Sequence, residues 1–188
     1  MEKINLTLLL GTNRNGRQSE HVYNYLKKLL EKRENINLRL VDVRDFDLPQ
    51  NEYGRDIKEQ FSDFSNTIET SDAIIIVAPE YNHSFPGRLK SVLDLLLKEY
   101  RKKAVGIASV SSGMWGGIRG IENLAPMLRL LGLWLIRKDL NFPNVAKLFD
   151  ESGQMKPEME ELYEGLFEEF MTELEWSARA LKWGRENL

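Results

Sequence analysis

The sequence contains no cysteine in its 188 residues. This absence excludes disulfides, thiolate nucleophiles, CxxC redox pairs and thiolate-ligated metals. Histidine is also scarce, because only His21 and His83 occur, and neither has a histidine partner at ligand spacing. A protein-held metal ion is therefore not expected, and any redox chemistry would come from a bound organic cofactor.

The chain also lacks a surplus of basic residues and a long apolar run. Lys and Arg number 26 against 29 Asp and Glu, so the formal net charge is -3 and nucleic-acid binding is not expected. No apolar run approaches the length of about 20 residues that spans a bilayer. The amino terminus lacks the basic region and the small-residue cleavage site of a signal peptide. We expect a cytoplasmic protein without membrane or nucleic-acid partners.

Short apolar runs alternate with longer amphipathic runs along the chain, which is typical of βαβ units around a parallel sheet. Five strands are predicted, at residues 4–10, 36–43, 73–78, 104–110 and about 134–140. The run AIIIVA at 73–78 is apolar throughout, so it belongs in the centre of the sheet.

Apolar residues at helical spacing predict a helix after each strand. The expected stripes centre on residues 22–30, 61–68, 89–96 and 121–131, with a long final helix after Pro157. Gly132 is expected to end the fourth helix, and Ser19 stands where it could cap the first. Together these elements predict a single α/β domain over residues 1–188. Its expected architecture is a three-layer, doubly wound, five-stranded parallel sheet with the flavodoxin-like strand order 2-1-3-4-5. In such sheets ligands bind beyond the carboxyl ends of the strands.

The first loop at this edge is GTNRNGRQS, residues 11–19. It nearly matches the triphosphate signature G-x-x-x-x-G-K-[ST], but Arg17 replaces the lysine and the hydroxyl comes one position late, at Ser19. The helix start offers unpaired N–H groups, and Thr12 and Arg14 add a hydroxyl and a charge. These features favour one phosphate group over a magnesium-bound triphosphate. The alternative is a solvated turn without a ligand.

Two further loops are expected at the same edge. The segment APEYNHSFPGRLKSVLD (78–94) presents Glu80, Tyr81, Asn82 and His83 after the central strand, where a planar ligand would lie. The segment SVSSGMWGGIRG (109–120) has four glycines, which let the backbone approach a ligand closely. The alternatives are rim packing for the aromatic residues and a flexible loop without a ligand. Trp115 could form a lid or lie in a subunit interface.

Taken together, the three loops resemble those of the NAD(P)H-dependent FMN reductases of the flavodoxin-like superfamily, a group that includes quinone and chromate reductases and some azoreductases. GTNRNGRQS is similar to that family's G-S-x-R-x-G-R loop, and the second segment to its P-E-Y-N-x-S-x-P-G-x-L-K-N-x-x-D signature. SSGMWGG resembles its glycine-rich flavin loop. Thr12 and Ser91 depart from the usual Ser and Asn. The resemblance covers residues 3 to about 155.

The resemblance implies an enzyme that passes hydride from NADPH or NADH to bound FMN, and then electrons to a small acceptor such as a quinone, free flavin, azo compound or metal oxyanion, in a ping-pong cycle. No catalytic side chain is expected, because the flavin carries the chemistry. The implied FMN-binding residues are Thr12, Arg14, Arg17 and Ser19 for the phosphate, Pro79, Glu80, Tyr81 and Asn82 for the ring and ribityl chain, and Ser111, Gly113, Gly116 and Gly117 for the opposite side of the ring. At the variable position of the second loop, His83 is expected to help select the acceptor or nucleotide.

Other readings stay open from the residues themselves. A flavodoxin-type electron carrier would share the fold without oxidising NAD(P)H, although Arg14 and Arg17 favour a reductase. A nucleotide-hydrolysing switch is a second alternative, but this sequence lacks the loop lysine and the strand-end aspartate that such a protein needs. A regulatory module that does not turn over is a third alternative. The resemblance also implies a homodimer or homotetramer. Leu95 and Leu97, beyond the third helical stripe, would be compatible with an exposed subunit interface. The alternative is that the sheet buries them.

Overall fold

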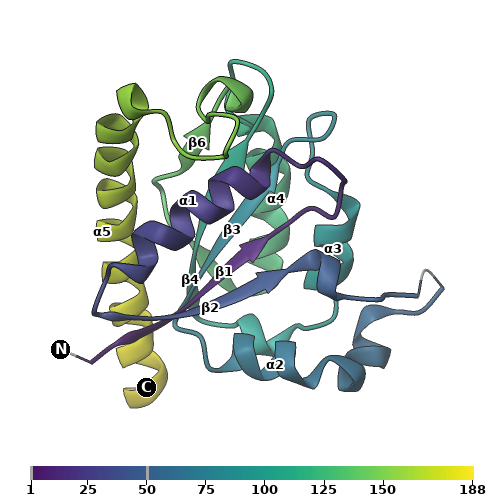
Figure 1. Ribbon diagram of the computed structural model, residues 1–188. Coiled ribbons are helices and arrows are strands. Elements are labelled where there is room, and N and C mark those ends of the chain that lie inside the picture. Colours follow the sequence, from purple (N-terminus) through teal and green to yellow (C-terminus); the bar gives the residue numbers. More distant parts are fainter. Residues whose placement is uncertain (1, 50) are drawn as a thin grey trace.

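The computed structural model describes residues 2–49 and 51–188 (Figure 1). Within them one parallel sheet is built from β1 (Ile4–Leu10), β2 (Ile36–Asp42), β3 (Ala73–Pro79), β4 (Lys103–Val110), β5 (Leu133–Leu135) and β6 (Leu140–Phe142). The strand order is β2-β1-β3-β4-β5, with β6 also paired to β4. This confirms the predicted α/β architecture and its order 2-1-3-4-5.

The predicted fifth strand was wrong in one respect, because it is divided into β5 and β6. β5 pairs with the first residues of β4, and β6 pairs with its last residues. Between them, the backbone N–H groups of Arg137 and Lys138 donate to the carboxylate of Glu173 at 2.9 and 3.1 Å. A side chain on the final helix thus takes hydrogen bonds that a continuous strand would have given to the ladder.

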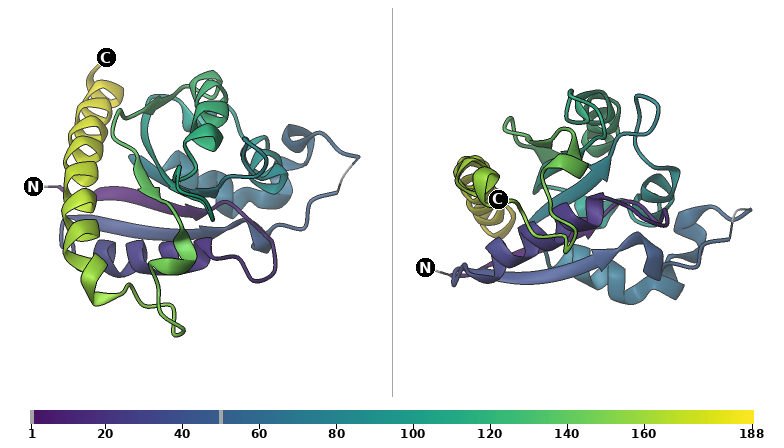
Figure 2. Two further views of the ribbon diagram at one scale, coloured as in Figure 1. Left: turned by 90° about the horizontal axis from the view of Figure 1, so that it is seen from above. Right: turned by 45° about the horizontal axis from the view of Figure 1, so that its top comes forward.

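Five α-helices cover the two faces of the sheet, and alternate strand residues point to opposite faces. One core lies under α1 (Ser19–Glu31) and α5 (Pro157–Asn187). The other lies under α2 (Ser62–Glu69), α3 (Gly87–Leu93) and α4 (Ile118–Leu130). Figure 2 shows the resulting three layers, with the sheet between the two groups of helices. Short 3-10 turns at 43–45, 54–61, 98–100 and 145–147 complete the connections.

Local sequence signals predicted most helix ends well. Gly132 follows α4 in a left-handed conformation with φ of 80°, as expected for a residue that ends a helix. One expectation was wrong. Gln18 is the capping position of α1, and the Ser19 hydroxyl makes no capping hydrogen bond. For Leu95 the second alternative holds: it is fully buried, because α3 ends at Leu93 and the chain turns into the core.

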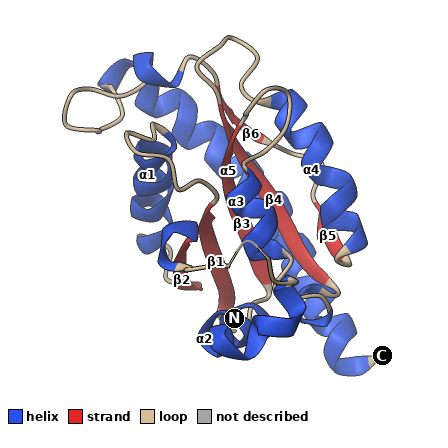
Figure 3. Ribbon diagram, turned by 90° about the vertical axis from the view of Figure 1, so that its right-hand side faces the viewer, coloured by secondary structure: helices blue, strands red, loops and turns tan. Residues whose placement is uncertain are grey.

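The fold brings the loops after β1, β3 and β4 to the carboxyl end of the sheet, beside the start of α1 (Figure 3). One continuous sheet supports the prediction of a single domain over residues 1–188, which remains a prediction. A search of the described helices for a stretch long and apolar enough to cross a bilayer gave no candidate.

Candidate functional site

The first loop is held in place by a buried arginine. Arg17 is only 6% exposed. Its guanidinium donates to the Thr12 carbonyl and to Asp42 Oδ1, the latter at 2.7 Å, and it also pairs with Glu20. Burial lowers the pKa of Arg17, but hydrogen bonds to Asp42 and Glu20 outweigh this, so the net shift is upward. Arg17 therefore carries a permanent charge at the base of the loop.

A second arginine, which the sequence reasoning missed, supports the same loop from β2. Arg44 lies two residues after the end of β2 and donates to the carbonyl oxygens of Asn13 and Arg14, at 3.3 and 2.6 Å. The side chain of Arg14 is exposed. The loop carbonyls are thus tied back toward the end of β2, while the Arg14 side chain stays available to a ligand.

The second loop forms a tight turn against the first. Tyr81 and Ser84 exchange backbone hydrogen bonds of 2.8 and 2.9 Å. The two residues between them, Asn82 and His83, both have positive φ, at 49° and 65°. This is the backbone pattern of a type I′ turn, in which asparagine is favoured. The turn aims the Tyr81 hydroxyl at Thr12 Oγ1, 2.8 Å away, so the two loops are directly joined.

Glu80 joins the second loop to α4. Its backbone N–H donates to the Val110 carbonyl at 2.9 Å, and its carboxylate accepts from the Gly120 N–H at 3.3 Å. Gly120 lies in the first turn of α4, where N–H groups lack intrahelical acceptors. The carboxylate therefore stabilises a helix start beside the loop.

The third loop is anchored by its glycines. Gly116 and Gly117 have φ of 64° and 84°, and both are buried. A Cβ on Gly117 would lie 3.0 Å from Ser109 Cβ, and one on Gly116 would lie 2.9 Å from Asn141 Cβ. These two glycines pack the loop against the sheet. Ser111, by contrast, faces the neighbouring loops, and its hydroxyl donates to the Gly113 carbonyl at 2.7 Å.

A cavity of about 130 Å³ opens where the three loops meet. Eight of the twelve predicted cofactor residues line it: Thr12, Arg14, Arg17, Ser19, Pro79, Glu80, Tyr81 and Ser111. The other four, Asn82, Gly113, Gly116 and Gly117, lie in the turns that flank it. Four further lining residues were missed: Gln18, Val110, Ser112 and Val145. Only Ser112 carried a sequence signal, as the second hydroxyl of its loop.

The cavity is too small for a whole dinucleotide or flavin, because small-molecule pockets usually measure about 300 Å³ or more. It fits one end of a larger ligand. Ser19 lines it at the start of α1, where helix N–H groups attract an anion. The Ser19 hydroxyl oxygen is buried and has no hydrogen-bond partner among the described residues. A buried hydroxyl without a partner is costly. The hydroxyls of Tyr25 and Tyr100 also lack partners in the described structure, but of the three residues Ser19 alone lines this cavity.

His83 and Arg119 form a pair at the outer side of the second loop. Arg119 Nη1 donates to an imidazole nitrogen of His83, and Asn123 Nδ2 donates to the His83 carbonyl at 2.7 Å. Trp115, four residues before Arg119 in the sequence, is 71% exposed. In the described part of the chain, Arg119 has no carboxylate partner, so its positive charge is not neutralised.

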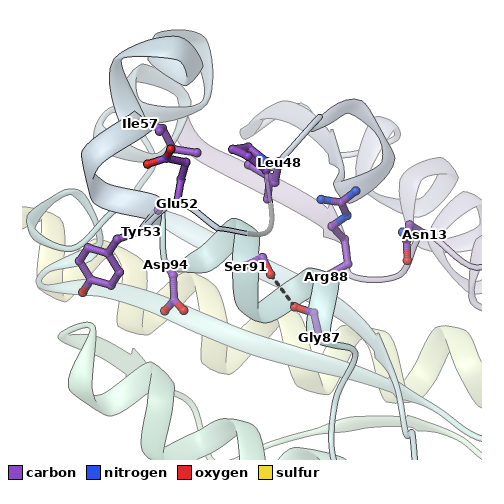
Figure 4. Close-up of a pocket in the computed structure, with 11 residues that line it drawn as sticks. Asn13, Leu48, Glu52, Tyr53, Ile57, Gly87, Arg88, Ser91 and Asp94 are labelled. Atoms are coloured by element: carbon purple, nitrogen blue, oxygen red, sulfur yellow. Dashed lines mark hydrogen bonds between the residues drawn. The ribbon is translucent and has the colours of Figure 1, made fainter.

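A second cavity of about 550 Å³ adjoins the first loop at Asn13 and runs between α3 and the 3-10 segment before α2 (Figure 4). Its lining carries charges of both signs, from Arg88 and from Glu52 and Asp94. Ser91, the departure from the family signature, donates to its own helix at the Gly87 carbonyl, 3.1 Å away. Ser91 therefore lies outside the 130 Å³ cavity that Ser19 lines. Across residues 2–49 and 51–188, no group of three or more acidic or histidine side chains is arranged to hold a metal ion.

Comparison with known proteins agrees with this geometry. The sequence profile of the NADPH-dependent FMN reductase family matches residues 4–147. A quinone reductase of Escherichia coli K12 is 30% identical over 148 residues, which cover 73% of this chain and 76% of that protein. A quinone reductase of Pseudomonas putida is 30% identical over 131 residues, 64% of this chain and 68% of that protein.

Among solved structures, the NAD(P)H:acceptor oxidoreductase FerB of Paracoccus denitrificans superimposes with a TM-score of 0.77 at 20% identity, covering 93% of this chain and 98% of that one. At this identity the likeness shows the fold alone. The family match rests on the sequence, and it spans the three loops that form the cavity. The chain belongs to the NADPH-dependent FMN reductase family of flavin-dependent oxidoreductases.

Proposed function

We propose that this protein holds FMN with its phosphate in the 130 Å³ cavity, oxidises NADPH or NADH and reduces a small acceptor such as a quinone, free flavin, azo compound or metal oxyanion. When bound, FMN supplies the hydride-accepting and electron-donating chemistry that the amino acids of the chain lack. The observation that carries the proposal is Ser19, which lines the cavity and whose buried hydroxyl lacks a partner among the described residues.

The chain would bind the phosphate with two kinds of group. The Ser19 and Thr12 hydroxyls and the first N–H groups of α1 donate hydrogen bonds, and Arg14 adds a charge from the loop surface. Arg17 would not contact the phosphate directly in our proposal, because its guanidinium already donates to the Thr12 carbonyl, Asp42 and Glu20. It would fix the shape of the loop and contribute its charge at a distance.

The other predicted residues would enclose the remainder of the cofactor. Tyr81, Asn82, Glu80 and Pro79 would contact one side, and the loop carrying Ser111, Gly113, Gly116 and Gly117 the other. The left-handed turn at Asn82 and His83 is rigid because both of its ends are hydrogen-bonded. Rigid backbone of this kind positions N–H groups without rearrangement during the reaction.

His83 and Arg119 would select the nucleotide or acceptor. Arg119 presents a positive charge from the first turn of α4, and His83 presents an imidazole from the second loop. Anionic groups of a dinucleotide or an anionic acceptor are suited to such a charge. Replacing Arg119 by Leu should therefore raise the KM for anionic substrates more than it raises the KM for a neutral quinone.

The decisive experiment is a spectrum of the purified protein followed by anaerobic titration with NADPH and NADH. We expect a yellow protein that bleaches with nucleotide and turns over with a quinone, giving the parallel double-reciprocal plots of a ping-pong order. A yellow protein inert to both nucleotides would support the electron-carrier alternative. A colourless protein that ignores added FMN would overturn the proposal.

A homo-oligomer, a dimer or a tetramer, also belongs to the proposal, as does a cytoplasmic location. The oligomer is supported by the family resemblance and by apolar side chains that stay exposed, among them Leu130 at 79% and Trp134 at 62%. The location is carried over as a prediction from the sequence.

A further inference from the structure

The first loop contains the dipeptide Asn15–Gly16, to which the proposed function gives no role. It is the one Asn-Gly pair in the 188-residue sequence. Neither residue lines the 130 Å³ cavity, although Arg14 and Arg17 on either side of the pair do. Both Asn15 and Gly16 are exposed. The pair therefore lies on the solvent side of the loop, between the two arginines.

The pair is unrestrained in the part of the chain that the structure describes. The hydrogen bonds that hold the loop are made by its other residues: Thr12, Asn13, Arg14 and Arg17. Among the described residues, none accepts a hydrogen bond from the Gly16 N–H or pairs with the Asn15 amide. Gly16 has a φ of 64°, and a Cβ added to it would have no heavy atom within 4 Å. The Asn15 side chain and the Gly16 backbone can therefore change their relative orientation.

An asparagine side chain can react with the backbone nitrogen of the residue that follows it. Hydroxide takes the Gly16 amide proton, and the nitrogen forms a bond to Asn15 Cγ. The bond from Cγ to the side-chain nitrogen breaks and ammonia leaves, so that a cyclic imide remains. Water then opens the imide at either carbonyl, which leaves an aspartyl or an isoaspartyl residue in place of Asn15. A following glycine favours this reaction, because it has no side chain to shield its nitrogen and adopts many backbone conformations.

We propose that Asn15 is a site of spontaneous deamidation, and that the reaction weakens the binding of a phosphate by this loop. Either product adds a negative charge between Arg14 and Arg17. The guanidinium of Arg17 is engaged by Asp42 and Glu20, so the new carboxylate is left to pair with exposed Arg14. It competes with the phosphate for that charge and repels the phosphate as well. The deamidation itself is independent of FMN, whereas the weaker binding rests on the proposed function.

The first test follows the modification by mass spectrometry and needs no activity measurement. The purified protein is incubated at mildly alkaline pH and cleaved after Glu2 and Glu20, which releases one peptide that contains both Asn13 and Asn15. Fragmentation of this peptide identifies the altered asparagine. Asn13 is the internal control, because it is exposed in the same loop but precedes Arg14. We expect Asn15 to deamidate about tenfold faster than Asn13, because only Asn15 precedes a glycine. Equal rates at the two positions, or an unmodified Asn15, would overturn the proposal.

The second test measures FMN affinity by fluorescence titration. Asn15→Asp carries the charge of the product on an ordinary main chain, and we expect it to bind FMN about fivefold more weakly, with a smaller loss at high salt. Asn15→Gln is the matched control, because it keeps a neutral amide and closes a ring more slowly.

After the same incubation, the wild-type protein should lose FMN affinity and Asn15→Gln should keep it. Equal affinity in fresh and fully deamidated wild-type protein would overturn the effect on binding. A protein that never binds FMN would overturn the proposed function together with that effect, while the mass spectra decide the modification separately.

Discussion

Both ends of the sheet bury polar groups, but the two ends differ in whether the chain itself supplies hydrogen-bond partners for those groups. At the amino end, the Asp72 carboxylate accepts from Asn5 N–H at 3.0 Å and from Arg185 at 2.6 Å. Lys103 Nζ donates to the carbonyl oxygens of Glu69 and Ser71, both at 2.7 Å. Burial, followed by the nearby Arg185 charge, lowers the pKa of Lys103 to about 8, yet both hydrogen bonds are made within the chain.

At the carboxyl end the polar groups are not fully satisfied by the chain. Ser19 is 2% exposed and its hydroxyl is unpartnered in the described structure, while the Arg14 side chain is exposed. Burying a hydroxyl without a hydrogen bond costs about 1–3 kcal/mol. The hydroxyls of Tyr25 and Tyr100 are also buried without a partner in the described structure, but of these three residues Ser19 alone lines the cavity where the loops meet. The contrast is therefore between charged groups that the chain itself pairs at the amino end and a hydroxyl beside a cavity at the carboxyl end, which we propose binds a ligand.

The largest expected effect is at the amino end. Asp72→Ala should lower the free energy of unfolding by about 3 kcal/mol, because it leaves Arg185 and the Asn5 N–H without their acceptor. Urea denaturation of the FMN-free protein measures this loss. FMN affinity of the folded variant should stay unchanged, and the exposed Asp47→Ala is the control. Weakened FMN binding in Asp72→Ala would remove the distinction between the two ends.

Arg17→Met should affect both properties. The variant removes the guanidinium that donates to the Thr12 carbonyl and to the Asp42 carboxylate, which keeps only the Arg44 N–H, so we expect a loss of about 2 kcal/mol in the free energy of unfolding. FMN should bind at least tenfold more weakly, because the loop loses its shape and its charge. The matched variant Arg14→Ala should weaken FMN binding without changing stability. Equal stability losses in both variants would contradict the separate roles assigned to the two arginines.

Ser19→Ala should weaken FMN binding by about 1.5 kcal/mol, roughly tenfold, which is typical of a hydrogen bond to a charged group. The FMN-free protein should be at least as stable as the wild type, since the hydroxyl has no partner to lose. Fluorescence titration with FMN and urea denaturation measure the two quantities. Ser177→Ala, at a buried serine of α5, is the control. A destabilised Ser19→Ala protein with normal FMN affinity would make Ser19 structural.

The smallest expected effect concerns Asp139, a carboxyl between β5 and β6. Burial, with Glu122 and Glu173 nearby, raises its pKa from the ordinary 3.8 to about 6. The folded state therefore binds this proton more tightly, and stability falls as pH rises between these values. Asp139→Asn should reduce the stability difference between about pH 4 and pH 7 by about 1 kcal/mol, a figure lowered for partial solvent exposure. An unchanged pH profile in urea denaturation would contradict this.

Local patterns in the sequence were enough to predict much of the fold and the three loops that line one cavity. The apolar run that forms β1 and the Gly132 helix end were correct because each depends on neighbouring residues. Glycine, proline and hydroxyl positions likewise indicated which loops would meet at the carboxyl edge. The expected cap at Ser19 was wrong, since whether a hydroxyl is satisfied depends on every group that packs around it.

The sequence by itself determined the strand-helix alternation, the three ligand loops and the residue types available to a phosphate, because these follow from periodicity and local backbone chemistry. Tertiary structure alone decided that Arg17 pairs with Asp42, that Glu173 interrupts the edge strand, and that Thr12 meets Tyr81. These contacts join residues 25, 36 and 69 positions apart. Such pairings are set by how the helices and strands pack, which no short stretch of sequence encodes.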